Sequence, residues 1–126
     1  MVLIAIIVLS FAAIFFIPKF GQDPAYHDFA DQRPFLGIPN FLDVASNLAF
    51  LIVGILGLRA CFRTRAGIEW TVLFVGVALV SVGSGWYHWN PNNGTLVWDR
   101  LPMTIGFMGL FVALLSEHVG ERLRML

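Results

Sequence analysis

The sequence has little charge and almost no cysteine, and both shortages narrow what the chain can be. Charged residues make up 13% of its 126 residues, about half the share of about 25% that is usual in soluble domains. With 58% hydrophobic residues, a disordered chain is excluded and a soluble domain is disfavoured. The single cysteine, Cys61, excludes an internal disulfide and a cysteine-based zinc site. Eight basic residues balance eight acidic ones without clustering, so we expect no nucleic-acid partner.

Four long apolar stretches are present instead, each close to the length of about 20 residues that a membrane span needs. They cover Met1–Ile17, Val44–Phe62, Ile68–Tyr87 and Leu101–Ser116. We therefore predict an all-α membrane protein with four transmembrane helices. It divides into an N-terminal transmembrane helix (1–18), an outer loop (19–43) and a helical domain (44–126). A signal peptide is the alternative for the first stretch, although no basic residue precedes it and no small-residue cleavage site follows it.

The basic residues predict which way the chain crosses the membrane, because cytoplasmic loops carry an excess of Lys and Arg. One side would hold Arg59, Arg63, Arg65, Arg122 and Arg124. The other side would hold Lys19, Arg33 and Arg100. We therefore expect an integral protein of the inner or plasma membrane, if the source is bacterial. Its residues 19–43 and 89–98 would face the outer, periplasmic or luminal, side.

Polar residues gather at the outer ends of three predicted spans. Ser84 and His88 lie four residues apart on one helix face, and Asp99 follows after a loop of ten residues. A loop this short makes the two helices antiparallel neighbours, so these three side chains can converge. Polar residues in membrane helices usually face a partner or a cavity. The other polar residues at this depth are Ser81 in the third span and Asp43, Ser46 and Asn47 in the second.

Each of these residues also has an ordinary structural explanation. Asp99 is alternatively a helix N-cap, with Pro102 tolerated in the first turn. His88 is alternatively an interfacial histidine, and Ser84 a small residue where helices pack closely. The chemical interpretation is metal-assisted hydrolysis. A histidine holds zinc, a carboxylate handles the proton of a water molecule, and a serine donates to an oxyanion.

The number of available ligands is the difficulty for a zinc site. Catalytic zinc usually takes three protein ligands and a water molecule, and His88 is the one well-placed histidine. His118 would lie about 25 Å along the helix from the outer end, near the opposite membrane face. His27 is on the correct side but falls in the outer loop.

Two runs in the sequence resemble the alkaline ceramidase family, within the membrane-hydrolase superfamily that includes the adiponectin receptors. They are Ser-Gly-Trp-Tyr-His at 84–88 and Asp-Arg-Leu-Pro-Met at 99–103. In that family a serine precedes a histidine by four residues, and an aspartate follows eleven residues later within an Asp-x-Leu-Pro-Met run. The Ser46-Asn47 pair is similar too, and the resemblance extends over 28–117.

The resemblance implies a seven-helix bundle, of which three helices of this chain would form the start. It implies His88 as a zinc ligand, Asp99 as the general base that later protonates the leaving amine, and Ser84 as a donor to the oxyanion. The implied substrate is a ceramide-like N-acyl sphingoid lipid of the surrounding bilayer, hydrolysed to a fatty acid and a sphingoid base.

The resemblance also suggests a calcium site in the outer loop. The family carries an Asp-Trp-x-Glu-x-Asn run and a later Glu, and here Asp28, Asp31 and Asn40 occupy similar positions. Carboxylate and amide oxygens suit calcium. Arg33 replaces one oxygen ligand by a cation, and the alternative is an ordinary solvated acidic loop.

The family's zinc site is completed by a His-x-x-x-His pair in its last helix, and this sequence has none. We therefore expect the N-terminal part of a zinc amidase, inactive alone and completed by further helices or another chain. One alternative is a non-catalytic four-helix membrane module with a receptor-like or assembly role. Another is a lipid esterase of the same superfamily, since the sequence does not separate ester from amide substrates.

Overall fold

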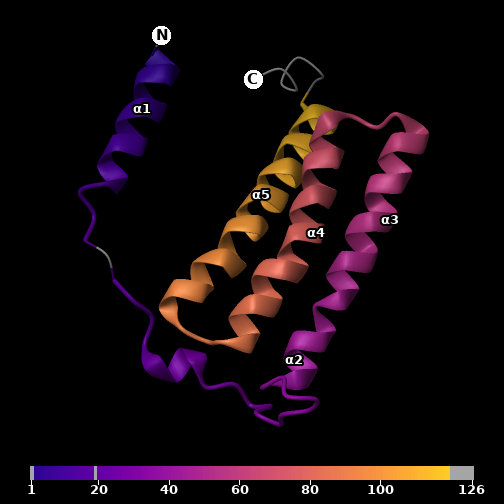
Figure 1. Cartoon of the computed structure of the whole chain (residues 1–126). Helices are drawn as coiled ribbons and strands as arrows, with labels where there is room; N and C mark the ends of the chain where they lie inside the picture. Colours follow the sequence, from indigo (N-terminus) through magenta and orange to yellow (C-terminus); the bar gives the residue numbers. More distant parts are fainter. Residues whose placement is uncertain (1, 19, 120–126) are drawn as a thin grey trace.

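The chain folds into helices joined by short connections, with no β-sheet among the residues described. The structure is a computed structural model that describes residues 2–18 and 20–119. In chain order the elements are α1 (Val2–Ile14), the 3₁₀ helix η1 (Pro24–His27), α2 (Phe41–Ser46), α3 (Leu48–Thr64), α4 (Ile68–Trp89) and α5 (Asn93–His118) (Figure 1).

Three helical segments are long and apolar enough to cross a membrane, which makes the chain an integral membrane protein. They are Phe41–Thr64, which combines α2 and α3, then α4 and α5. The predicted all-α class is confirmed for the described residues, and so are three of the four spans. In place of the fourth, α1 has 13 residues, or about 20 Å of helix, against a hydrocarbon layer of about 30 Å. This helix stands apart from the bundle (Figure 1), and its role as a span stays a prediction.

The bundle is built around α4, which packs against α3 on one side and α5 on the other (Figure 1). Glycines allow the two close approaches between α4 and α5. A Cβ atom at Gly76 would lie 2.5 Å from the backbone nitrogen of Gly106, and one at Gly83 would lie 2.0 Å from the carbonyl oxygen of Trp98. Membrane helices associate through such small residues because the lipid offers no hydrophobic driving force between helices.

The start of α5 differs from the prediction. Asn92 is the N-cap, and its side chain accepts from the backbone of Gly94 and Thr95 while the Thr95 hydroxyl accepts from the Asn92 backbone. This reciprocal capping box begins the helix at Asn93, eight residues before the expected start. The alternative that Asp99 caps the helix is therefore wrong, since it lies within the second turn.

Pro102 consequently lies inside α5 rather than in its first turn. Because proline has no N–H, the carbonyl of Trp98 four residues earlier loses its helical donor. The backbone of α4 at Gly83 approaches this same carbonyl. The irregular turn of α5 is thus covered by the neighbouring helix rather than by lipid, as backbone at membrane depth requires.

The two connections within the bundle put the arginines at opposite ends, as the predicted crossing of the membrane requires. The turn between α3 and α4 lies at the end opposite the turn between α4 and α5 (Figure 1), so Arg59, Arg63 and Arg65 lie toward one end and Arg100 toward the other. Lys19, Arg122 and Arg124 lie outside the described residues. The direction of insertion stays a prediction.

We predict that Gly83→Ala destabilises the bundle while Gly85→Ala, two residues along the same helix, does not. The added methyl at Gly83 would collide with the Trp98 carbonyl, whereas a Cβ at Gly85 meets nothing within 4 Å. Overpacking of this kind costs about 1–3 kcal/mol, and alanine at an open helical position gains up to about 1 kcal/mol. Thermal unfolding in detergent micelles measures both. Equal melting temperatures for the two variants would contradict this account of the α4–α5 contact.

Candidate functional site

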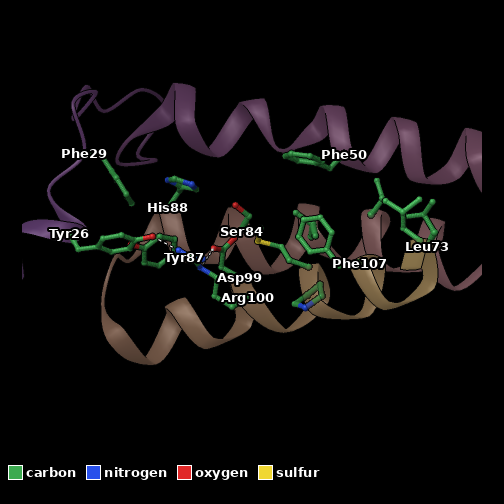
Figure 2. Close-up of a pocket in the computed structure, with 17 residues that line it drawn as sticks. Tyr26, Phe29, Phe50, Leu73, Ser84, Tyr87, His88, Asp99, Arg100 and Phe107 are labelled. Atoms are coloured by element: carbon green, nitrogen blue, oxygen red, sulfur yellow. Dashed lines mark hydrogen bonds and ion pairs between the residues drawn. The ribbon is translucent and has the colours of Figure 1, made fainter. Parts of the chain in front are cut away.

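A pocket of about 640 Å³ lies between α4 and α5, Phe50 of α3 and the segment that connects to α2 (Figure 2). This segment, residues 20–40, contains η1 and is called the outer segment below. The end of the pocket near η1 and the α4–α5 turn, which we call its outer end after the predicted direction of insertion, carries the polar groups, and the rest is apolar. The 17 lining residues are Tyr26, Phe29, Phe50, Leu73, Gly76, Val77, Val80, Ser84, Tyr87, His88, Asp99, Arg100, Pro102, Met103, Gly106, Phe107 and Leu110.

The two predicted catalytic residues, Ser84 and Asp99, and the predicted zinc ligand His88 all line this one pocket. Ser84 and His88 lie one turn apart on α4, and Asp99 comes from the second turn of α5. Ser84 is buried, and the Asp99 side chain is 13% exposed. Figure 2 shows Ser84 and Asp99 near the middle of the pocket, with His88 toward the outer segment. The expected convergence of these side chains is therefore what the packing of α4 against α5 produces.

The other polar residues expected at this depth do not join the pocket. The Ser81 hydroxyl donates to the carbonyl of Ala78 within α4. Ser46 and Asn47 both donate to the carbonyl of Asp43, each at 2.8 Å, where α2 ends and α3 begins. They satisfy the backbone at this break in the second span, which is a structural role.

The outer segment holds His88 from two directions. The ring of Phe29 lies 4.5 Å from the imidazole, centroid to centroid. The side chain of Asn40 donates to the carbonyl oxygen of His88 at 2.8 Å. The His88 Nδ1 atom is buried and makes no hydrogen bond to any described residue. An imidazole nitrogen without a partner is the form in which histidine can accept a ligand.

A second set of contacts ties η1 to the bundle, and sequence reasoning missed it. His27 Nδ1 and the hydroxyl of Tyr87 are 2.9 Å apart, and Arg100 donates to the hydroxyl of Tyr26. Arg100 also pairs with Asp99, with its Nε atom 3.6 Å from Oδ2. The partners in the first two pairs lie 60 and 74 residues apart in the sequence. No local pattern in the sequence connects them. The available signal in the sequence was the pair of aromatic residues, Tyr26 and Phe29, close to His27 in the predicted outer loop.

The residues present fit a zinc ion only in part. His88 offers one buried nitrogen without a hydrogen-bond partner among the described residues, in the pocket that Asp99 also lines. No group of three His, Cys, Asp or Glu side chains suited to a metal ion occurs within 2–18 and 20–119. Catalytic zinc usually needs three protein ligands, so the described residues do not complete such a site.

Each residue expected to bind calcium makes one contact with another protein group. The Asp28 carboxylate accepts from the side chain of Gln32, and the Asp31 carboxylate pairs with Arg33 at 2.5 Å. Hydrogen bonding to this guanidinium lowers the pKa of Asp31 below its ordinary value, and the carboxylate in turn raises the pKa of Arg33. The second Asp31 oxygen is buried without a hydrogen-bond partner in the described chain. Asn40, the third expected ligand, uses its amide nitrogen on His88.

Comparison with known proteins assigns the family. The family model described as Ceramidase matches residues 37–126, which is most of the chain. This chain belongs to the ceramidase family. The matched region contains Ser84, His88 and Asp99, together with Asn40, and it begins after Asp28 and Asp31. No curated protein and no solved structure matches the chain.

We predict that Tyr87→Phe loosens the outer segment without unfolding the bundle. The substitution removes the hydroxyl that pairs with His27 while the buried ring stays. Loss of one such hydrogen bond costs about 1 kcal/mol, so amide exchange in residues 24–29 should rise about fivefold. Hydrogen exchange with mass spectrometry measures it. Trp86→Phe, on the exposed face of the same helix, is the matched control and should leave exchange in this segment unchanged. Unchanged exchange in Tyr87→Phe would show that the His27 contact does not hold the segment.

Proposed function

We propose that this chain contributes part of the active site of a zinc-dependent membrane amidase that hydrolyses ceramide-like N-acyl sphingoid lipids to a fatty acid and a sphingoid base. Membership of the ceramidase family suggests an amide-hydrolysing enzyme and a lipid substrate. The observation that carries the proposal is the convergence of Ser84, His88 and Asp99 on one pocket whose inner part is apolar.

The pocket suits a lipid whose amide lies at the polar end and whose acyl chain extends inward. Leu73, Phe107 and Leu110 line the inner part, where an acyl chain would gain about 0.8 kcal/mol for each buried CH₂ group. The polar groups lie at the outer end of α4 and α5. An amide held there would have its carbonyl within the reach of Ser84 and Asp99.

In the proposed reaction, water adds to the amide carbonyl carbon and the C–N bond breaks. The Asp99 carboxylate accepts the proton of the attacking water and returns it to the departing amine nitrogen, as a general base and then a general acid. The Ser84 hydroxyl donates a hydrogen bond to the oxyanion that forms on the carbonyl oxygen. The products are a carboxylic acid and an amine, with the atoms of one water molecule divided between them.

We also propose zinc as the cofactor, with His88 as one ligand. Zinc, when bound, would lower the pKa of water and polarise the amide carbonyl. The buried, unpartnered Nδ1 of His88 supports this role. The remaining ligands would come from further helices or from another chain, and we expect no catalysis until they are supplied. By the arginine distribution, the site would face the outer side of the membrane.

We predict that Asp99→Asn and Ser84→Ala lower hydrolysis of a fluorescent ceramide by about 10²–10⁴-fold and 10²–10³-fold respectively. The test uses the natural product of the gene, reconstituted in nanodiscs. We further expect about one zinc ion per chain, lost in His88→Ala, with metal content measured by plasma mass spectrometry. His118→Ala is the matched control, because His118 is exposed at the far end of α5.

The alternatives give different results in the same assays. An esterase would cleave a fluorescent acyl ester while sparing the ceramide, with the same dependence on Asp99. A non-catalytic module would show neither hydrolysis nor zinc and would form a stable oligomer. Stoichiometric zinc that survives in His88→Ala would overturn the ligand assignment.

Calcium binding in the outer loop is a separate proposal that rests on the family resemblance and on the buried free oxygen of Asp31. We predict that the double variant Asp28→Asn, Asp31→Asn weakens calcium binding at least about tenfold, because calcium affinity follows the number of carboxylate ligands. Terbium luminescence with calcium competition measures it. Asp23→Asn is the control, since an asparagine can keep its cap on the Ala25 backbone. Terbium binding that is equal in all three proteins would contradict the site.

A further inference from the structure

Arg100 lines the polar end of the pocket, next to Asp99. Among the described residues that line this pocket, it alone carries a permanent positive charge. Its side chain is 53% exposed, and Figure 2 shows it next to Asp99 and on the same side of the pocket as Tyr26. A lipid that enters with its amide near Asp99 would therefore bring its polar end close to this guanidinium.

The protein leaves much of this guanidinium available. One terminal nitrogen donates to the Tyr26 hydroxyl, and the carbon of the guanidinium lies 5.9 Å from the centre of the Tyr26 ring. These contacts orient the group, but a phenol is neutral and leaves the positive charge in place. The second terminal nitrogen makes no hydrogen bond to any described residue, although an arginine carries five N–H donors.

The contact with Asp99 is too long to explain the role of the Arg100 guanidinium. Its Nε atom lies 3.6 Å from the Asp99 oxygen, whereas charge-assisted hydrogen bonds to carboxylates measure about 2.7–2.9 Å and are often bidentate. An arginine that served only to neutralise this carboxylate would be expected to make the shorter contact. Arg100 instead contacts both Asp99 and Tyr26 and keeps further donors available in the part of the pocket that it lines.

We propose that Arg100 selects lipids that carry an acidic oxygen group, a carboxylate, phosphate or sulfonate, at the polar end next to the scissile amide. The inference rests on the proposed function, because it assumes that an N-acyl lipid occupies the pocket. A planar guanidinium matches such groups with two parallel hydrogen bonds. The same chemistry could come from the amine part of the substrate or from the carboxylate of the released fatty acid, and the experiment separates the two.

The test measures equilibrium binding of radiolabelled lipids to the whole protein in nanodiscs, with empty nanodiscs subtracted. N-palmitoylglycine and N-palmitoylglycinamide form a matched pair that differs in the terminal carboxylate, and palmitate places the carboxylate at the amide position. At about pH 8 both carboxylates are ionised. We expect the wild type to bind the glycine form at least about tenfold more tightly than the glycinamide, as a charge-assisted contact predicts.

Arg100→Gln should reduce this preference to within about twofold, and Arg100→Lys should keep part of it, because a lysine retains the charge without the bidentate geometry. Arg63→Gln, exposed near the opposite end of the bundle, should keep all of it. Loss of affinity for N-palmitoylglycine in Arg100→Gln assigns the contact to the substrate. Loss for palmitate alone assigns it to the product and overturns the substrate preference.

The wild type decides the question even if Arg100→Gln fails to fold. Equal wild-type affinity for the glycine and glycinamide lipids overturns the inference while leaving the lipid pocket in place. An Arg100→Gln variant that binds both lipids equally weakly compared with wild type would show that Arg100 only supports the structure. If neither lipid gives a binding signal above that of empty nanodiscs, the proposed lipid pocket is wrong, and this inference is wrong with it.

Discussion

The close contact between α4 and α5 is the constraint on which the rest of the structure depends. At Gly83 the backbone of α4 meets the carbonyl of Trp98, which lacks a helical donor because Pro102 follows four residues later. A side chain at residue 83 would push the helices apart. Asp99 is the next residue after this carbonyl, and Ser84 is the next after the glycine, so the same contact that closes the seam brings these two side chains into one pocket.

This arrangement separates two requirements that conflict in a membrane protein. Polar side chains at membrane depth are costly unless they have partners or water, while the pocket must be apolar enough for a lipid chain. The polar groups therefore lie at the outer ends of α4 and α5, within reach of the outer segment, and the apolar wall continues inward past Phe107. The outer segment supplies Asn40 and Phe29 to hold His88, and the buried Nδ1 atom of His88 has no hydrogen-bond partner among the described residues.

Spacing along the sequence was enough to predict that Ser84, His88 and Asp99 line one pocket, because helical periodicity and a short connection leave little freedom for two antiparallel neighbours. It did not predict where α5 begins. The cap is Asn92 with Thr95 rather than the commoner serine or threonine with glutamate, and this adds two turns before the expected start. Nor did it predict the contacts of the outer segment, since Tyr26 and Arg100 are 74 residues apart and meet only through the fold. The span assigned to 1–18 came from composition alone, and the described helix is shorter.

Burial of an acyl chain is favourable but has no direction, since its free energy follows the area removed from water. An apolar wall alone would let a lipid slide along the pocket, and the amide would then rarely stop beside Asp99. Hydrogen bonds at the polar end fix the position along the pocket because they depend on distance and angle. The polar groups that could form them, Arg100 and the hydroxyls of Tyr26 and Tyr87, come from segments far apart in the sequence. Substrate position would therefore depend on how the outer segment docks on the bundle, whereas the positions of Ser84 and Asp99 depend on the α4–α5 contact.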